Sequence, residues 1–375
     1  MSLKIEYYSG NEKEWDKFIL EDSMNGTFLQ TRRFINYHHE GKFKDCSVCV
    51  RKGNELMAAI LACEIYSDGI KTMFAHKGST FGGLTVSKKI YSASMTDELF
   101  RLIHDFAQSE NFGKIYIKTV PVIYQRENSD LIDYFMYKYG GRSYSELNYY
   151  IRLHDFRDDF TSHFSASKRR DYRYSLKNGF TFRKLETHEE IASFYEILKK
   201  NLRKFNAPAV HSLEDLYDLK FNRFNDRIEF YGVFLDDILT AGSMIFTFGD
   251  DIIHTQYLCS DEDYLHLFSM DFLIANLIKT ALERNMRIFS FGVCTEDQGR
   301  YLNFGLSRFK EGFGTEFCIN KSYELLIANS ESQSIIETRN TKHETRNTKH
   351  ETRNTKHETR NTKHETRNIY CSDMG

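Results

Sequence analysis

Hydrophobic and polar residues follow one order of segments twice along the chain. In each half, three stretches rich in β-branched and aromatic residues are joined by short turn signals such as Gly53-Asn54 and Asp236-Asp237. This pattern predicts three consecutive strands in each half. The predicted strands span residues 45–52, 55–67 and 71–77 in the first half, and 227–235, 238–248 and 252–259 in the second.

A helix and one further strand follow each triplet of strands. Apolar residues recur at helical spacing over 93–109 and 268–284, and short apolar runs at 114–119 and 287–291 predict strands. Corresponding elements lie roughly 175–180 residues apart, so two copies of one unit are the most economical architecture. We therefore predict an α/β (α+β) chain of two tandem subdomains, each a mixed, mostly antiparallel sheet flanked by helices.

The boundary between the two units is predicted between residues 153 and 154. Proline does not mark it, because the chain contains only two prolines, Pro121 and Pro208. The glycine pair Gly140-Gly141 and the polar stretch 154–167 are the remaining signals. They give a first subdomain over 1–153 and a second over 154–328.

The end of the chain repeats the heptapeptide ETRNTKH without change over residues 337–364. A period of seven is typical of coiled coils, but no position of this heptad is apolar, so a helix would have no seam to bury. We predict that residues 329–375 form a disordered tail that carries no chemistry.

The charge balance argues against a dedicated nucleic-acid binder. The 375 residues include 51 Lys and Arg against 53 Asp and Glu, for a net charge of −2. Because the repeats are cationic, residues 1–336 alone carry −5. Without a global basic field, DNA is excluded as a partner, and any anionic ligand must be met by a local cluster.

Membrane and secretory segments are not expected. No stretch approaches the roughly 18–20 consecutive apolar residues of a membrane span, and the start of the chain has no apolar run, which predicts a cytoplasmic protein. The seven cysteines are scattered and mostly lie in apolar stretches, which indicates reduced core thiols. Cys46 and Cys49 have CxxC spacing without a second pair or a histidine cluster, so no metal site is expected.

A basic segment, SKRRDYRYSLK at residues 167–177, precedes the helix stop Asn178-Gly179. On a helix, Arg169, Arg173 and Lys177 form one cationic stripe, and Arg170 and Tyr174 share the neighbouring face. Guanidinium groups bind phosphate oxygens in pairs, so the stripe suits a phosphate-bearing ligand. The alternative is an ordinary solvated helix face.

A second cluster follows the strand that ends near Gly292. The acidic loop after it contains Asp297, and Phe309-Lys310 then precedes Gly312. Ligands of α/β sheets collect beyond the carboxyl ends of strands, where this loop would lie. A fixed lysine there would stabilise developing negative charge. The alternative is a solvated lysine in a glycine-rich turn.

A third segment, HKGSTFGG at 76–83, follows the third strand of the first half. Its backbone amides could cradle an anion, with Gly82 and Gly83 at its end. It matches neither of the glycine-rich phosphate motifs, and a plain connecting loop is the alternative.

Taken in order, these segments resemble the FemAB-like branch of the GNAT acyltransferase superfamily. The resemblance covers about residues 1–325, and its most specific part is FSFG followed by FKEGFG. The other matching segments are GTFLQTRRF, HKGSTFGG, SKRRDYRYSLKNGF, AGSMIF and the strand around 254–257. Two tandem GNAT-like subdomains would account for the duplicated order of elements.

The resemblance implies transfer of an acyl or aminoacyl group to an amine, commonly on a peptidoglycan precursor, with aminoacyl-tRNA as donor in the best-known branch. It implies that Lys310 stabilises the oxyanion, with Phe309 beside it, and that Tyr257 lines the cleft. It also implies acceptor-phosphate contacts from Arg170 and Tyr174, for which Arg169 and Arg173 have equivalent spacing. Asp297, Glu296 and His254, in that order, are the available protein bases.

Two departures leave the donor open between aminoacyl-tRNA and acyl-CoA, with no tightly bound cofactor. The stretch between Phe180 and Arg227 is too short for the charged helical hairpin that some relatives insert. The coenzyme A signature is also missing from the strand-to-helix loop CSDEDYLHLFSMD, whose acidic residues would repel a pyrophosphate.

Three functions remain on this evidence. The first is an acyl or aminoacyl transferase acting on a phosphate-bearing cell-envelope precursor, such as one of peptidoglycan or polysaccharide. The second is a small-molecule N-acetyltransferase that uses acyl-CoA, and the third is a non-catalytic binding module that keeps the fold. The enzyme requires Lys310 in a cleft, whereas a Lys310 facing bulk solvent would favour the binding module.

Overall fold

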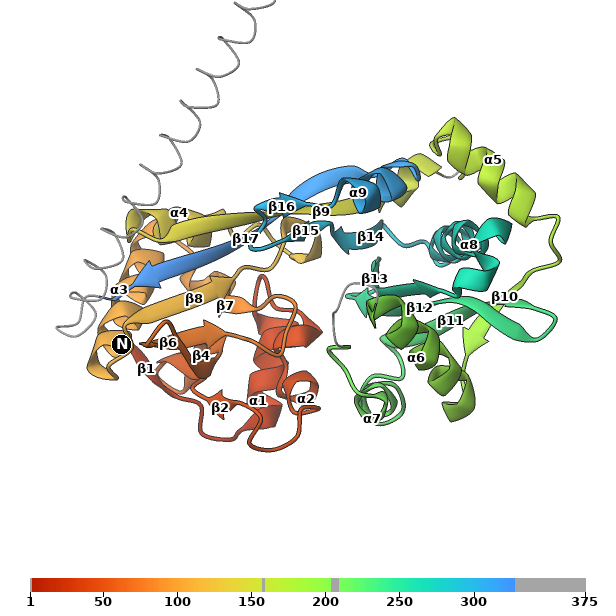
Figure 1. Ribbon diagram of the computed structural model, residues 1–375. Helices are drawn as coiled ribbons and strands as arrows, with labels where there is room; N and C mark the ends of the chain where they lie inside the picture. Colours follow the sequence, from red (N-terminus) through yellow and green to blue (C-terminus); the bar gives the residue numbers. More distant parts are fainter. Residues whose placement is uncertain (1, 157–158, 204–208, 328–375) are drawn as a thin grey trace, which may run out of the picture.

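The computed structural model describes residues 2–156, 159–203 and 209–327. Two mixed α/β bodies lie side by side and are joined by long strands (Figure 1). The first body contains β1 (Leu3–Tyr7), α1 (Glu12–Lys17), η1 (Phe18–Asp22), η2 (Phe28–Gln30), α2 (Arg32–Ile35), β2 (Lys44–Asp45), β3 (Val48–Lys52), β4 (Glu55–Leu61), β5 (Cys63–Ser67), β6 (Ile70–Ala75), β7 (Gly83–Val86), η3 (Lys88–Ile90), α3 (Ala93–Ser109), β8 (Lys114–Lys118), η4 (Val122–Tyr124), α4 (Asp130–Lys138) and β9 (Arg142–Arg152).

The second body has a similar order of strands and helices along the chain. It contains η5 (Leu153–Phe156), α5 (Ala166–Ser175), β10 (Thr181–Leu185), α6 (His188–Arg203), α7 (Leu213–Tyr217), η6 (Asp218–Arg223), β11 (Ile228–Leu235), β12 (Ile238–Phe248), β13 (Ile252–Ser260), η7 (Glu262–Leu267), α8 (Ser269–Glu283), β14 (Ile288–Val293), β15 (Thr295–Glu296), β16 (Tyr301–Leu302), α9 (Phe304–Glu311) and β17 (Glu316–Leu326). The predicted helices over 93–109, 167–177 and 268–284 are confirmed. The predicted tail lies outside the described residues.

Five strands of the second body are neighbours in one sheet, whereas β15 and β16 form a separate two-stranded sheet. The order of the five strands is β10-β11-β12-β13-β14, with antiparallel hairpins followed by the parallel pair β13–β14. The amphipathic helix α6 packs against β12 and β13, and α8 packs against β11, β12 and β13. The three consecutive strands predicted for this half are confirmed.

The first body differs, because its second predicted strand is wrong. Residues 55–67 form two strands, β4 and β5, which lie in different sheets. The break is at Ala62, whose N–H donates to Ser47 Oγ at 2.9 Å and whose carbonyl accepts from Cys46 N–H at 3.0 Å. These bonds hold the backbone of Ala62 at the junction, so that β4 joins β1, β3 and β7 while β5 joins β6 in the long sheet.

The two bodies exchange strands. In the eleven-stranded sheet, β9 pairs with β14 of the second body, and β17 lies between β9 and β8. Tyr323 and Leu325 of β17 are therefore buried in the core of the first body, and Tyr149 and Ile151 of β9 in the core of the second. The predicted boundary at residue 153 thus follows a strand that both bodies use.

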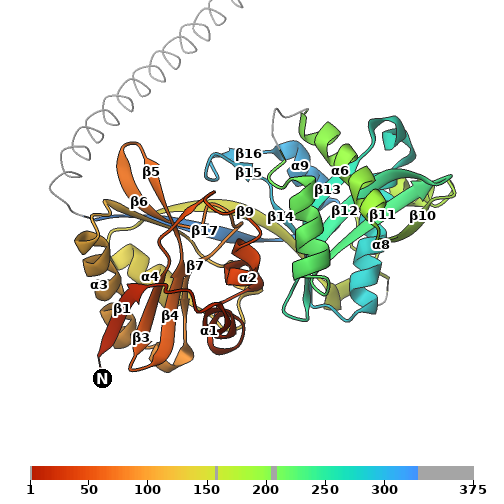
Figure 2. The ribbon, with the colours of Figure 1, turned by 90° about the horizontal axis from the view of Figure 1, so that it is seen from below.

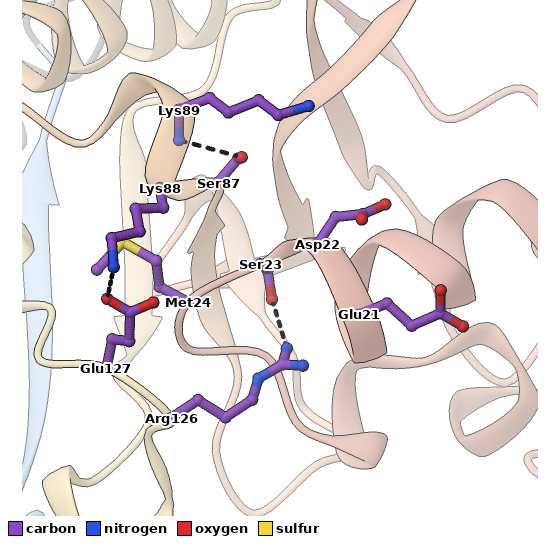
Figure 3. Close-up of a pocket in the computed structure, with 9 residues that line it drawn as sticks. All are labelled: Glu21, Asp22, Ser23, Met24, Ser87, Lys88, Lys89, Arg126 and Glu127. Atoms are coloured by element: carbon purple, nitrogen blue, oxygen red, sulfur yellow. Dashed lines mark hydrogen bonds and ion pairs between the residues drawn. The ribbon is translucent and has the colours of Figure 1, made fainter.

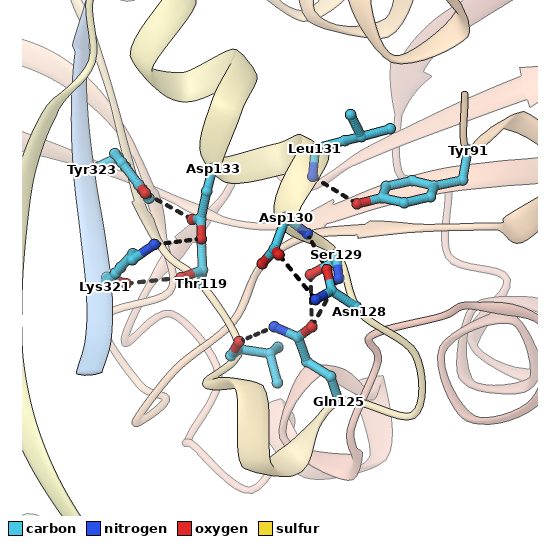
Figure 4. Close-up of polar contacts among 11 residues, drawn as sticks. Tyr91, Thr119, Gln125, Asn128, Ser129, Asp130, Leu131, Asp133, Lys321 and Tyr323 are labelled. Carbon is cyan, nitrogen blue, oxygen red and sulfur yellow. Dashed lines mark hydrogen bonds and ion pairs between the residues drawn. The ribbon is translucent and has the colours of Figure 1, made fainter. Parts of the chain in front are cut away.

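Polar contacts fix the end of β17 on the first body (Figure 4). Lys321 Nζ and Tyr323 Oη donate to the carboxylate of Asp133 in α4 at 2.8 and 2.7 Å. Thr119, just after β8, donates its amide to the carbonyl of Lys321 at 3.0 Å. The end of the second body is therefore a structural part of the first.

Aromatic side chains from both bodies pack where the bodies meet. Phe28 lies 5.0 Å from Phe248 and 5.2 Å from Phe224 between ring centroids. Phe81 lies 5.0 Å from Tyr124, which in turn lies 4.7 Å from Phe248. Burial of such large rings stabilises the contact between the two bodies. Among the described residues, no helix has both the length and the apolar character needed to cross a bilayer.

Candidate active site

The parallel strands β13 and β14 separate after a short paired stretch. Their register runs from Ile252 opposite Ile288 to His254 opposite Ser290 and includes only three pairs. Both strands continue beyond these pairs, β13 to Ser260 and β14 to Val293. The backbone edges of the two strands are therefore open to other partners. An opening at the carboxyl ends of parallel strands is where α/β sheets bind ligands.

Lys310 lies at this opening. It is in the last turn of α9, a helix that begins at Asn303, whose side chain accepts from Leu306 N–H at 3.0 Å. Its side chain is buried, and Nζ donates to the carbonyls of Phe291 at 2.9 Å, Gly292 at 3.1 Å and Val293 at 2.9 Å. Burial lowers the pKa of Lys310. The ammonium is thus fixed on the free edge of β14 and does not face bulk solvent.

His254 lies beside Lys310 at the point where the strands part. Its Nδ1 is 2.9 Å from Tyr124 Oη and 3.4 Å from Ser290 Oγ, and Tyr124 Oη donates to Ser290 Oγ at 2.7 Å. Burial, together with the positive charge of Lys310, lowers the pKa of His254 to about 3, so the imidazole is neutral at pH 7. Gly292 has φ +72°, and a Cβ there would come within 3.0 Å of His254 Cε1. Only glycine fits both constraints.

A second group of side chains extends the site toward the first body. Tyr257, three residues beyond His254 on β13, has its Oη 2.6 Å from Nδ1 of His211, which lies between α6 and α7. Tyr37 of the first body stacks on the His211 ring, with centroids 5.3 Å apart and the planes at 27°. Burial lowers the pKa of His211 to about 4 and raises the pKa of Tyr257. Both groups are therefore uncharged at neutral pH.

The sequence did not single out His211 or Tyr37. Each stands alone in its segment, and the two are far apart in the chain, so no local pattern joins them. The GTFLQTRRF segment ends three residues before Tyr37 and was the nearest signal.

The basic helix α5 holds the predicted phosphate ligands and lies on the outer side of the second body, against α8 (Figure 1). Arg169 donates to the carbonyls of Ser162 and Phe164, and Arg170 pairs with Asp171. Arg173 and Tyr174 are exposed, and the Tyr174 ring stacks on that of Phe268. The structure thus places this group away from the surface that faces the first body.

One lysine of α5 nevertheless connects the helix to the site. Lys168 Nζ donates to Asp271 of α8 at 2.6 Å and lies 4.3 Å from the centre of the Phe309 ring, next to Lys310. The contact fixes α5, α8 and α9 relative to one another, with Phe309 as part of the packing.

Asp297 and Glu296 lie on the exposed hairpin β15–β16. Asp297 is in the turn, with φ +47°, and its carboxylate is 4.0 Å from Arg300. The hairpin rests on β9, because a Cβ at Gly299 would lie 1.8 Å from the carbonyl oxygen of Ser145. These carboxylates are not among the groups that contact Lys310, His254 or Tyr257.

The loop glycines of the first body have structural partners. Gly82 N–H donates to the carbonyl of Lys118 at 3.0 Å. Gly83 has φ +89°, and a Cβ there would lie 2.7 Å from the Ile117 side chain and 2.9 Å from Lys118 O. Close approach of β7 to β8 accounts for the glycine at this position.

The N-terminus of α8 already carries a carboxylate. Asp271 lies in the first turn and pairs with Lys168, and Glu262 and Asp263 precede the helix in η7. A diphosphate bound there would meet these negative charges. In the part of the chain that the structure describes, no group of three or more His, Cys, Asp or Glu side chains is placed to hold a metal ion.

Comparison with known proteins gives one family match and several similar folds. Residues 164–311 match the model of the acetyltransferase (GNAT) domain. No curated protein matches the chain in sequence. The crystal structure of FemX is similar at 13% identity, with 89% of this chain and 99% of that chain covered and a TM-score of 0.65.

Two further structures have the same tandem arrangement. A domain from Agrobacterium fabrum assigned to a lysylphosphatidylglycerol synthetase is 13% identical, covers 87% of this chain and 94% of its own, and has a TM-score of 0.55. A tandem GNAT protein from the clavulanic acid biosynthesis pathway is 11% identical, covers 88% and 100%, and has a TM-score of 0.53. At these identities the likeness shows the fold, and the family match falls within the second body.

Proposed function

We propose that this chain, which carries a GNAT domain in a FemAB-like fold, transfers an acyl or aminoacyl group to an amine. The observation that supports the proposal is the opening between β13 and β14, where Lys310 and the neutral His254 lie together inside the family-matched residues. Such a site offers positioning and one fixed positive charge, the two main demands of acyl transfer.

In the proposed reaction, the amine nitrogen attacks the carbonyl carbon of the donor ester or thioester. The nitrogen loses one proton, the bond from the carbonyl carbon to the leaving oxygen or sulfur breaks, and the leaving atom gains a proton. Lys310 stabilises the intermediate oxyanion by turning one N–H from a β14 carbonyl toward it. The neutral His211, hydrogen-bonded to Tyr257 of the same strand as His254, serves as the proton carrier.

The donor that best suits the site is an aminoacyl ester such as aminoacyl-tRNA. The paired Asp271 at the start of α8 and the acidic residues before it disfavour the diphosphate of coenzyme A at that helix. No cofactor needs to stay bound, because donor and acceptor carry all the reacting atoms.

We further propose that the acceptor amine belongs to a phosphate-bearing cell-envelope precursor reached in the cytoplasm. The similar folds include FemX and a lysylphosphatidylglycerol synthetase domain, whose name specifies an aminoacylated lipid. The cluster of Tyr37, His211 and Tyr257, which joins residues of both bodies, is the place we propose for such an extended acceptor.

The test is a transfer assay with the full chain. Purified protein is incubated with mixed charged tRNA, and separately with short-chain acyl-CoA thioesters, together with amine acceptors that include peptidoglycan precursors carrying lysine or diaminopimelate. Mass spectrometry should detect an added aminoacyl group in the tRNA arm that Lys310→Met reduces strongly. Transfer from acyl-CoA alone would contradict the proposed donor, and transfer in neither arm would contradict the proposed function.

A non-catalytic role has one observation in its favour. All three N–H groups of the Lys310 ammonium are engaged by backbone carbonyls, which is also the geometry of a purely structural clamp. The Lys310→Met variant separates the two, because a clamp affects only stability.

A further inference from the structure

A cavity lies between the two bodies, at the end of the β13–β14 pair opposite to the candidate active site. It has a volume of about 540 Å³ and meets β13 at Ile252 and the chain just before β14 at Arg287. The first body contributes Thr27, Phe28 and the segment from Tyr124 to Arg126. The open edge that holds Lys310 is beyond Ser290, so this cavity is distinct from the candidate active site.

Three guanidinium groups from three separate segments line the cavity. Arg126 follows η4 in the first body, Arg227 precedes β11 and Arg287 precedes β14 in the second body. Asp251 is the only carboxylate among the described residues that line it. Residues 1–336 carry a net charge of −5. The cavity, with three arginines and one carboxylate, is therefore a positively charged site on a negatively charged part of the chain.

Backbone carbonyls and neighbouring carboxylates hold the arginines in place, and Arg227 and Arg287 each keep unused N–H groups. Arg126 donates to the carbonyls of Leu20 and Ile19, the latter at 2.7 Å, and to Ser23 Oγ at 3.2 Å. Arg227 Nη1 donates to the carbonyl of Gly249 at 3.1 Å, and its Nε lies 3.6 Å from the carboxylate of Asp226. Arg287 donates through Nε to Asp251 at 2.7 Å and through Nη2 to a carbonyl of η4 at 3.4 Å. Arg227 Nη2 and Arg287 Nη1 make no hydrogen bond to the described residues. Preorganised forks with free N–H groups are suited to anion oxygens.

A neighbouring pocket, whose positive and negative side chains are balanced in number, serves as a comparison (Figure 3). This pocket of about 340 Å³ also includes Arg126, but its three cations face three carboxylates. Lys88 pairs with Glu127 at 2.6 Å, and Lys89 pairs with Glu55 outside the pocket. The excess of guanidinium groups therefore distinguishes the cavity between the bodies from this neighbouring pocket.

We propose that the cavity between the two bodies binds a phosphate or diphosphate group, which Arg227 and Arg287 hold through their free N–H groups while Arg126 contributes from the first body. The oxygens of such a group match the fork of a guanidinium, and a diphosphate spans two forks. The bound anion contacts both bodies at a point where, among the described residues, no shared strand connects them.

The site also adjoins the candidate active site through one residue. Tyr124 lines the cavity, and its hydroxyl is the group 2.9 Å from His254 Nδ1. Binding in the cavity would therefore affect the paired end of β13 and β14 through Tyr124. The proposed anion site does not depend on transferase activity.

The experiment measures binding of inorganic diphosphate and inorganic phosphate to the full chain by calorimetry, with the shift in melting temperature as a second readout. We expect diphosphate to bind with a dissociation constant below about 10 mM and to raise the melting temperature. Arg227→Gln and Arg287→Gln should each weaken binding by about tenfold or more, and affinity should fall as salt rises. Lys89→Gln, in the neighbouring pocket, is the matched control and should bind as the wild type does.

Two results would overturn the proposal. One is the absence of diphosphate and phosphate binding by the wild type up to about 10 mM. The other is binding that survives in both arginine variants, or that Lys89→Gln weakens equally, since the anion would then be held elsewhere. The binding experiment contains no acyl donor. A negative result would therefore contradict the anion site without bearing on the proposed transfer reaction, which has its own assay.

Discussion

The two bodies contain the same parallel pair of strands, yet only one pair is open. In the first body, β6 and β8 are paired from Thr72 to Ala75, which is the last residue of β6. In the second body, β13 continues for six residues beyond its last pair at His254. Rings of Phe74 and Tyr116 stack 4.5 Å apart over the closed pair. The two copies of this unit thus differ at the place where the proposed reaction needs an opening, and only the second body has one.

Each pair of strands has a lysine near its end, and the two lysines differ in their contacts. Lys310 holds three consecutive carbonyls of the open strand β14. Among the described residues, Lys118, at the end of β8, donates to a single carbonyl, that of Ser79 at 3.4 Å, and it lies 5.6 Å from the Phe74 ring. Burial lowers the pKa of both groups. The proposed catalytic role therefore belongs to Lys310, and Lys118 serves as its matched control.

The largest expected effect is that of Lys310→Met. Turnover should fall by about 10²–10³, the loss on removing one oxyanion donor. The substitution also leaves three carbonyls without their donor, so the free energy of unfolding should fall by about 1–3 kcal/mol. Steady-state transfer assays and denaturant unfolding measure the two quantities.

Lys118→Met is the matched substitution in the first body. It should leave turnover within about twofold of the wild type, because the closed pair holds no reacting group. Equal losses of turnover in the two variants, or full turnover in Lys310→Met, would remove the distinction between the bodies.

A smaller loss is expected for substitutions at the hydrogen-bonded pair His211 and Tyr257. His211→Gln should reduce turnover by roughly 10–10²-fold, because the proton carrier is lost while Tyr257 and Tyr37 remain. Tyr257→Phe, which removes only the hydroxyl bonded to His211, should have the same direction of effect. A pH profile of kcat would separate a proton carrier from a packing residue, since only the former changes its shape.

The control for this substitution is His76→Gln in the first body. His76 is also buried, and burial lowers its pKa to about 3, but it belongs to the loop after the closed strand β6. Its replacement should affect stability and leave kcat unchanged. A fall in kcat as large as that of His211→Gln would place catalysis in both bodies.

The sequence predicted the elements of the second body better than the organisation of the first. Its hairpins are local and their turns have strong signals, so β11, β12 and β13 were found in order. The strand predicted over 55–67 failed because its division at Ala62 depends on Ser47, a contact that periodicity does not record. The exchange of β9 and β17 was equally hidden, since pairing between residues 142 and 324 has no local signature.

Predicting the candidate site from the sequence has the same limit. Lys310 and His254 were accessible from sequence, because one lies in a distinctive motif and the other on a predicted strand. The contacts of Lys310 with the carbonyls of Phe291 to Val293 could not be predicted from the sequence, because they depend on how β14 bends at Gly292. His211 and Tyr37 meet only in three dimensions.

Acid should destabilise both bodies alike. The pKa of His76 and His254 is about 3 and that of His211 about 4, all below the ordinary value of 6.5. As the pH falls from 6.5 toward 4, the unfolded chain takes up protons that the folded chain does not, so stability falls by up to about 1.4 kcal/mol per pH unit for each histidine. Above pH 6.5 the three groups contribute no further change.

Denaturant unfolding at pH 7.5 and 5 measures this slope. His254→Asn should reduce it, because one proton-binding difference between the folded and unfolded states is removed. A slope that is unchanged in His254→Asn would mean that carboxylates, not this histidine, cause the acid sensitivity.

The smallest effect is expected where the chain passes beyond both bodies. The first body uses the chain as far as Ile327, whose side chain is buried in its core with Leu325. The ETRNTKH repeats that follow have no apolar position that could offset the cost of ordering, about 1–2 kcal/mol per residue. Truncation after Ile336 should therefore leave the melting temperature within about 2 °C of the wild type. Leu325→Ala, by contrast, should cost about 2–4 kcal/mol, because it empties a core position of the first body. If the truncation were as costly as Leu325→Ala, the repeats would be part of the fold and the division between scaffold and tail would have to move toward the end of the chain.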